Sequence, residues 1–340
     1  MAKQIVFTKV NTAELIDVEE SMILPRQVAV RTEFSTISNG TERANITGDA
    51  NITIDSEENE PVVFPSASGY SSSGTVIAKG SDVKSVDIGD KVAMSWSLHK
   101  NVNIIPEEYV EKIYDGKISM QEAAICHIAT FPMAAIRKTM LEIGESMMIM
   151  GLGILGLAAV QLAKAAGAVP VIAVDPILIR REKALNLGAD HVFDPCNIDF
   201  ITKVKELTGG GVNTAVEVTG LGEGLNQCLD CMVKFGRIAL LGCTRNSNFT
   251  VDYYRKVHGP GIQIIGAHTA ARPSKESYPG YFTQKDDMKA MLKLCAAKRI
   301  CLKDMVDAVY SPKDCSEVYK RLINDKNFPA VVQFDWRDIK

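Results

Sequence analysis

A glycine-rich turn constrains the fold of this chain more than any other segment. The turn reads Gly151-Leu-Gly153-Ile-Leu-Gly156, follows the apolar run 146–150 (SMMIM), and opens an alanine- and leucine-rich segment with helical character. In such a strand–turn–helix the first glycine permits a tight turn, the second lets the backbone approach a pyrophosphate, and the third lets helix and strand pack closely. The pattern predicts a dinucleotide-binding βαβ unit.

The phosphates and the ribose of a dinucleotide each have an expected partner in this unit. A helix N-terminus offers free N–H groups and the positive end of the helix dipole to phosphate. Asp175 ends the next apolar run (VIAVD), 22 residues beyond Gly153, where a carboxylate accepts hydrogen bonds from ribose hydroxyls and repels a 2′-phosphate. NAD(H) is therefore expected over NADP(H). The expected cofactor contacts at the turn are Gly151, Gly153, Ile154, Leu155 and Gly156.

Two points about this region stay open. Arg180 follows Asp175 by five residues, and it either lies beside the adenosine or is a solvated surface arginine. A glycine turn can also pack a βαβ unit that binds nothing. The agreement of strand, turn, helix and acid favours a cofactor site.

The chain length indicates two domains, since 340 residues exceed what one hydrophobic core usually serves. Residues 1–118 are β-rich, and their polar, acidic stretch 45–61 is expected to be a surface loop. Residues 119–270 alternate strands and helices, which predicts an α/β fold with a doubly wound parallel sheet. Residues 271–340 form a C-terminal segment with helices expected near 286–297 and 316–323.

The first helix after residue 118 has a defined start and an internal breaker. Ser119 and Glu122 have the spacing of a capping box, in which each side chain satisfies a backbone donor near the other residue. The apolar helical stretch that follows extends to about Leu141. Pro132 lies inside it and is expected to kink or divide the helix.

Charge and composition exclude several other classes of protein. Thirty-eight basic residues face 41 acidic ones, for a net charge of −3, so the basic excess of a nucleic-acid binder is absent. No signal peptide and no run of 18 apolar residues is visible, so no membrane partner is expected. The eight cysteines of a long, unexported chain are expected to be reduced thiols, which favours the cytoplasm.

Four further segments resemble the medium-chain dehydrogenase/reductase superfamily: residues 73–80 (SGTVIAKG), 88–92 (IGDKV), 186–190 (NLGAD) and 217–220 (EVTG). The resemblance implies a GroES-like catalytic domain built from the N-terminal part and the C-terminal tail. A Rossmann domain is inserted between them, with the active site in the cleft. It also implies that Thr219 contacts the cofactor, and that the chain forms a homodimer or homotetramer.

The sequence departs from the zinc-dependent members of that superfamily. Asn39 occupies the cysteine position before a Gly-Thr/Ser-Asp turn, and Gly69-Tyr70-Ser71 replaces Gly-His-Glu. The third ligand position is His127, so one residue suited to zinc remains, whereas catalytic zinc needs three protein ligands. No metal is therefore expected. The departures resemble a zinc-free subgroup that includes bi-domain sugar-related and bacteriochlorophyllide-type oxidoreductases.

The cysteines give no replacement metal site. The structural-zinc lobe of the superfamily carries four closely spaced cysteines, and this chain has none before Cys126. Cys228 and Cys231 have CxxC spacing without a second pair, and they are interpreted as helical core cysteines.

Without zinc, side chains must handle the proton of an alcohol substrate. Tyr70 and His127 are candidate acid–base groups, Asn39 a donor to the substrate oxygen, Thr41 a relay hydroxyl, and Glu42 an orienting or substrate-binding group. Each has an alternative: His127 as a core histidine, Tyr70 as a pocket wall, and the others as residues that shape the turn. The other histidines, His99, His191, His258 and His268, are second-rank candidates.

The expected function is reversible oxidation of a secondary alcohol, with a polyol or sugar as the hydroxylated small-molecule substrate. One alternative is a zinc-free enoyl or quinone reductase acting on an activated C=C bond. Asp175 counts against it, because those relatives prefer NADPH. The other alternative is an NAD(H)-binding protein that performs no chemistry.

Overall fold

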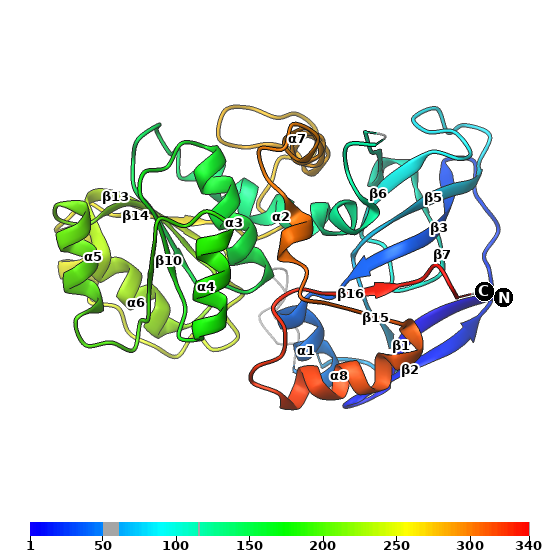
Figure 1. Cartoon of the computed structure of the whole chain (residues 1–340), viewed down its shortest axis with the longest axis horizontal. Helices are drawn as coiled ribbons and strands as arrows, with labels where there is room; N and C mark the ends of the chain where they lie inside the picture. The colour runs from blue at the N-terminus through cyan, green and yellow to red at the C-terminus, as the bar shows by residue number, and fades with distance from the viewer. Residues whose placement is uncertain (50–60, 115, 340) are drawn as a thin grey trace. The chain divides into compact units, whose positions relative to one another are not determined.

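The computed structural model describes residues 1–49, 61–114 and 116–339. The chain divides into two compact units, coloured by residue number in Figure 1. The first unit comprises Met1–Ile128, Met288–Lys298 and Val306–Lys340, and the second comprises Ala129–Asp287 and Arg299–Met305. Of the stretch 45–61 expected to be a loop, residues 50–60 lie outside the described residues.

The first unit is built on two β-sheets. A small sheet has the order β2-β1-β4, and a seven-stranded sheet has the order β15-β16-β3-β5-β6-β8, with β7 also paired to β3. The C-terminal strand β16 pairs antiparallel with β3, and Gln333 lies opposite Thr36, so the tail of the chain joins the N-terminal sheet. The strands are β1 Ala2–Lys9, β2 Thr12–Val18, β3 Gln27–Thr36, β4 Ser66–Ala67, β5 Ser71–Lys79, β6 Lys91–Ser95, β7 Val102–Pro106, β8 Val110–Lys112, β15 Ala308–Tyr310 and β16 Val332–Asp335.

Helix α1 (Asn39–Thr47) was not predicted, because Asn-Gly was interpreted as a turn signal. Residues 39–42 form its first turn instead. The Glu42 side chain accepts a hydrogen bond from the Ser38 backbone N–H (2.8 Å). This bond satisfies a backbone donor at the start of the helix that has no acceptor within the helix. Helix α8 (Cys315–Asn324) lies close to α1 and β2, and its buried side chains join the core around Phe7 and Phe334.

The second unit is a six-stranded parallel sheet, as the alternating pattern predicted. Its order is β11-β10-β9-β12-β13-β14, so the direction of winding reverses between β9 and β12. Helices α3 and α4 cover one face and α5 and α6 the other (Figure 1). The elements are β9 Met147–Met150, α3 Ile154–Ala165, β10 Val171–Val174, α4 Leu178–Asn186, β11 His191–Phe193, α5 Phe200–Thr208, β12 Val212–Glu217, α6 Gly222–Cys231, β13 Met232–Leu240 and β14 Gln263–Gly266.

Helix α2 (Met120–Lys138) starts with the Ser119 hydroxyl accepting from the Glu122 N–H at 3.2 Å, as a capping box predicts. The helix is not divided at Pro132, so that part of the expectation was wrong. Residues 122–136 are all buried, and burial on this scale offsets the one backbone hydrogen bond that proline removes. The last long helix, α7, spans Gln284–Ala296.

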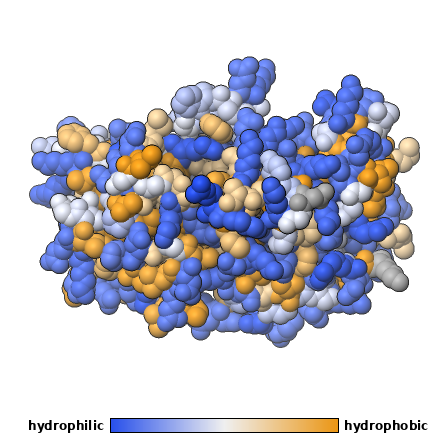
Figure 2. Space-filling view, turned by 45° about the horizontal axis from the view of Figure 1, so that its top comes forward, coloured by the Kyte–Doolittle hydropathy of each residue, from blue (hydrophilic) through white to orange (hydrophobic). Residues whose placement is uncertain are grey.

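All eight cysteines are free thiols, and Cys228 and Cys231 lie in the core between α6 and the parallel sheet, as predicted. Within the described residues, no helix combines the length and apolar character that crossing a membrane requires. Hydrophilic residues dominate the face shown in Figure 2, with hydrophobic groups scattered among them.

Candidate cofactor and substrate sites

The three glycines of the turn after β9 have different surroundings in the second unit. Gly151 has a φ of +100°, a backbone conformation that favours glycine. A Cβ at Gly156 would lie 1.8 Å from the Gly151 carbonyl oxygen, so only glycine lets α3 pack this closely. A Cβ at Gly153 would meet no atom within 4 Å. The turn is thus closed at its two ends and open at its middle, where a phosphate can approach.

The N-terminus of α3 begins at this open position. Gly153 is the N-cap residue and has no side chain with which to bond the first-turn amides. The first amides of a helix have no intrahelical acceptor, so those of Ile154 and Leu155 suit an anion.

Asp175 lies directly after β10 and is 4% exposed. One carboxylate oxygen accepts from the Leu152 N–H at 2.8 Å and the other from the Ile177 N–H at 2.8 Å. Each oxygen keeps further lone-pair capacity for ligand hydroxyls. Arg180 lies 3.8 Å from this carboxylate, and Arg181, which the sequence did not indicate, donates to the Asp175 carbonyl oxygen at 2.6 Å.

Thr219 lies beside the glycine turn, since a Cβ on Gly151 would be 2.9 Å from its methyl carbon. Buried Glu217 holds it there. The Thr219 N–H (2.7 Å) and hydroxyl both donate to Glu217, as does the Gly220 N–H at 3.1 Å. Burial raises the pKa of Glu217, while these hydrogen bonds act to lower it. Glu217 was visible in the sequence only as part of a family signature, without a role.

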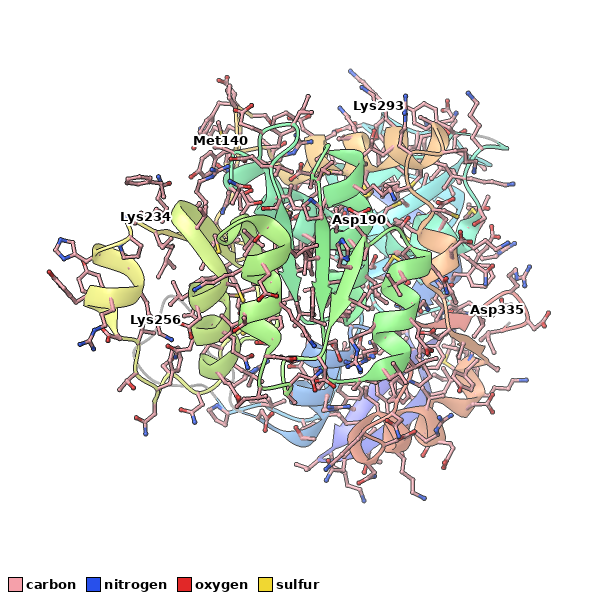
Figure 3. All side chains as sticks on the ribbon, turned by 60° about the vertical axis from the view of Figure 1, so that its left-hand side comes forward. Met140, Asp190, Lys234, Lys256, Lys293 and Asp335 are labelled. Atoms are coloured by element: carbon pink, nitrogen blue, oxygen red, sulfur yellow. The ribbon has the colours of Figure 1, made fainter. Side chains whose placement is uncertain are left out.

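The segment 186–190 of that resemblance has a structural function. Asp190, labelled in Figure 3, accepts from the Val171 N–H at 2.7 Å, and its own N–H donates to the Val171 carbonyl oxygen. The pair of bonds fixes the start of β10 against the residue that directly precedes β11. Asp190 is thus occupied at the opposite end of β10 from Asp175.

In the first unit, three rings meet at the positions compared with zinc ligands. The ring centroids of Tyr70 and His127 are 5.9 Å apart, and those of Trp96 and His127 are 4.8 Å apart. His127 is fully buried on α2, whereas Trp96 is 43% exposed and has a φ of +58°. Trp96 was not predicted, because nothing in its local sequence marks an exposed indole in a left-handed conformation.

The Tyr70 hydroxyl donates to the Ser38 hydroxyl oxygen. Burial, and then the charge of Glu42, raise the pKa of Tyr70 to about 12, although hydrogen bonds with Ser38 and Thr41 act to lower it. The phenol therefore keeps its proton at neutral pH and acts as a hydrogen-bond donor. Ser38 was not among the predicted site residues, since a lone serine before Asn-Gly carries no distinctive signal.

Asn39 and Glu42 bond to the interior of the first unit. The Asn39 amide donates to the carbonyl oxygens of Pro329 (2.8 Å) and Ala330 (3.2 Å), which ties α1 to the C-terminal segment. Glu42 is 1% exposed, and its carboxylate bonds to His99 and Tyr319 in addition to Ser38. The structure thus brings Ser38, Thr41, Tyr70 and His127 together, while the Glu42 carboxylate bonds the Ser38 backbone N–H and the buried side chains of His99 and Tyr319.

The three side chains compared with zinc ligands do not make a usual zinc site, because only the imidazole of His127 is a common zinc ligand. The residues compared with ligands are Asn39, Tyr70 and His127. Across residues 1–49, 61–114 and 116–339, no group of three or more His, Cys, Asp or Glu side chains is arranged to hold a metal. Catalytic zinc requires three protein ligands and an open position.

Residues 155–297 match the family model described as zinc-binding dehydrogenase. D-guloside 3-dehydrogenase of Escherichia coli (strain K12) is 27% identical over 341 residues, which covers 95% of this chain and 96% of that enzyme. These matches support the medium-chain dehydrogenase/reductase, alcohol dehydrogenase-like superfamily, and they support an oxidoreductase.

Solved structures of several dehydrogenases share the fold. 2R,3R-butanediol dehydrogenase from Bacillus subtilis superposes with a TM-score of 0.81 at 22% identity, covering 98% of this chain and 99% of that one. A putative zinc-binding dehydrogenase from Sinorhizobium meliloti bound to NADP has a TM-score of 0.80 at 18% identity, with coverage of 98% and 99%. An alcohol dehydrogenase from E. coli CFT073 complexed with NADH has the same TM-score at 16% identity and the same coverage.

Proposed function

We propose that this chain is a zinc-independent, NAD(H)-dependent oxidoreductase that interconverts a secondary alcohol and its ketone, with a polyol- or sugar-like substrate. The observation that carries the proposal is the cluster of Ser38, Tyr70 and His127. It groups two hydroxyls and an imidazole where the zinc-dependent members of the superfamily have metal ligands.

The second unit fits the cofactor. The open middle of the glycine turn and the first amides of α3 suit the pyrophosphate, and Asp175 suits the ribose hydroxyls. The negative charge of Asp175 beside that ribose disfavours a 2′-phosphate, which supports NAD(H) over NADP(H). Thr219, held against Gly151, and Arg180, near Asp175, are the remaining proposed contacts. The bound nicotinamide supplies the acceptor or donor of the hydride.

The residues of the first unit handle the proton. In alcohol oxidation the substrate oxygen loses a proton as its carbon loses a hydride, and the developing alkoxide needs hydrogen-bond donors. Tyr70, protonated at neutral pH, turns its one proton from the Ser38 oxygen to the substrate oxygen, and Thr41 supplies a second hydroxyl donor. His127 is the proton acceptor, since a neutral imidazole has one ring nitrogen that can take a proton. Asn39 and Glu42 contribute by holding α1, which carries Thr41.

A hydroxylated, ring-shaped substrate suits this group of residues. Trp96 exposes an indole next to the Tyr70 ring, with ring centroids 5.9 Å apart, and aromatic rings together with hydroxyl groups match a compound with both C–H and O–H surfaces. The similarity to D-guloside 3-dehydrogenase supports the same substrate class.

Two broader properties complete the proposal. The free cysteines agree with a reducing compartment such as the cytoplasm. The partly exposed strand β14 at the edge of the parallel sheet supports a homodimer or homotetramer, because a second copy can continue the sheet there.

The test combines metal analysis with a substrate screen. Protein purified without chelator, before and after incubation with zinc, is expected to hold less than about one-tenth equivalent of metal. Polyols and glycosides are then screened with NAD+ and with NADP+. Near-stoichiometric zinc would overturn zinc independence. A clear NADP+ preference together with reduction of activated C=C bonds would favour the enoyl or quinone reductase, and nucleotide binding without any turnover would favour the non-catalytic protein.

A further inference from the structure

Five buried polar side chains of the first unit form a hydrogen-bonded network that is connected to the Tyr70 cluster. The Trp336 indole N–H donates to the Ser35 hydroxyl oxygen at 2.8 Å, and the same oxygen is 2.7 Å from His99 Nδ1. His99 Nε2 is 3.1 Å from Glu42 Oε2, and the Tyr319 hydroxyl donates to that oxygen at 2.5 Å. All five side chains are at most 1% exposed, so water cannot replace any of these bonds.

The chemistry of each group decides which atoms donate hydrogen bonds in this network. An indole N–H can only donate, so Ser35 accepts from Trp336 and also bonds His99 Nδ1. A carboxylate can only accept, so His99 donates from Nε2 to Glu42. Burial, and then the charge of Glu42, raise the pKa of Tyr319 well above its ordinary value, so this hydroxyl also stays a donor. Both donors meet Glu42 Oε2, and His99 Nε2 is also 3.3 Å from Oε1, so together they fix the direction of the carboxylate.

The other oxygen of the same carboxylate reaches the proposed active site. Glu42 Oε1 accepts from the Ser38 backbone N–H at 2.8 Å, and the Ser38 hydroxyl in turn accepts the proton of Tyr70. A buried carboxylate without donors is costly, so Glu42 keeps this orientation only while His99 and Tyr319 hold it.

We propose that His99 and Tyr319 are positioning residues for Tyr70, acting through Glu42 and Ser38. They set the place of the Tyr70 hydroxyl without touching substrate or cofactor. The effect on catalysis rests on the proposed function, whereas the effect on Tyr70 itself does not. The site is therefore completed by His99 and Tyr319, which are 57 and 277 positions away from Glu42 in the sequence.

The test uses the full-length chain with variants Tyr319→Phe, His99→Leu and His99→Gln. Tyr319→Phe removes one hydroxyl and keeps the ring that packs on Phe7 at 4.9 Å. His99→Gln keeps an N–H donor for Glu42. The matched control is Tyr310→Phe, which removes a hydroxyl bonded to Arg321 at 3.0 Å, outside this chain of groups.

Two measurements separate positioning from general stability. The first is the NMR signal of the Tyr70 ring carbon bonded to oxygen, assigned by Tyr70→Phe in protein labelled at that carbon. We expect it to shift in Tyr319→Phe and His99→Leu, to recover in part in His99→Gln, and to stay unchanged in Tyr310→Phe. The second is steady-state kinetics. Loss of a hydrogen bond to a charged group should lower kcat about tenfold or more in Tyr319→Phe, with the KM for NAD+ unchanged.

An unchanged Tyr70 signal in folded Tyr319→Phe protein overturns the proposal, even if the melting temperature falls. A shifted signal with kcat unchanged supports the positioning of Tyr70 and removes Tyr70 from the proposed mechanism. If His99→Leu does not fold, Tyr319→Phe decides the question alone, because its ring packing is retained.

Discussion

Two buried carboxylates, one in each unit, have partners of different kinds. Asp175 is 4% exposed. Its carboxylate accepts from two backbone N–H groups, of its own turn and the neighbouring one, and lies 3.8 Å from Arg180, which leaves acceptor capacity toward the open glycine turn. Glu42 is 1% exposed and is enclosed by side chains from distant parts of its unit. The first arrangement can receive an external ligand, whereas the second is complete without one. Burial of an acid therefore does not by itself mark a ligand site.

Of the three carboxylates, Glu42 should cause the largest loss of stability when it is replaced. Glu42→Leu leaves the donors of His99, Tyr319 and the Ser38 N–H unsatisfied, and breaking a buried hydrogen-bonded pair costs about 3–5 kcal/mol. We expect a loss of that size in the free energy of unfolding, measured by urea denaturation. Glu107→Leu is the control, since Glu107 is partly exposed and its replacement should cost much less. Equal losses in both variants would show that Glu42 is not the centre of a network.

The same contrast explains which features could be predicted from the sequence and which could not. The strand, glycine turn and helix that precede Asp175 were predicted because they lie with it within 30 consecutive residues and each has a local requirement. The parallel sheet followed from the same alternation of elements. Helix α1 was missed, since its start depends on Glu42 rather than on a side-chain cap from Ser38.

The group around Tyr70 was only partly predictable, for a different physical reason. The positions Tyr70 and His127 emerged from comparison with a family pattern. Ser38 and Trp96 gave no signal, because their roles arise from tertiary contacts across the first unit. The partners of Glu42 are separated from it by 57 and 277 residues, and no spacing rule connects side chains that far apart.

Changing Asp175 should affect binding more than stability. Asp175→Asn keeps one acceptor oxygen and removes the charge, so we expect NADH affinity to fall about tenfold or more and NADPH affinity to rise, as the repulsion of a 2′-phosphate disappears. Fluorescence titration with both nucleotides measures this. Asp190→Asn, the same charge change in the same unit, is the control, because Asp190 bonds Val171 at the other end of β10. A parallel loss for both nucleotides would contradict a ribose-binding role and point to a structural one.

Glu217 shares features with both Asp175 and Glu42, and its replacement should have the smallest effect of the three. It is enclosed by its own loop, as Glu42 is by its network, yet burial raises its pKa despite three donors from Thr219 and Gly220. Because the folded state holds this proton more tightly than the unfolded chain, Glu217 adds stability below about pH 4.3, the unfolded value. That stability is lost as pH rises through the folded pKa. The difference in unfolding free energy between the parent chain and Glu217→Gln should therefore fall from about pH 4 to pH 7. A difference that grows with pH would mean that the hydrogen-bond donors lower the pKa of Glu217 more than burial raises it. Glu217 would then resemble Glu42, as a charged carboxylate whose partners are all within the protein.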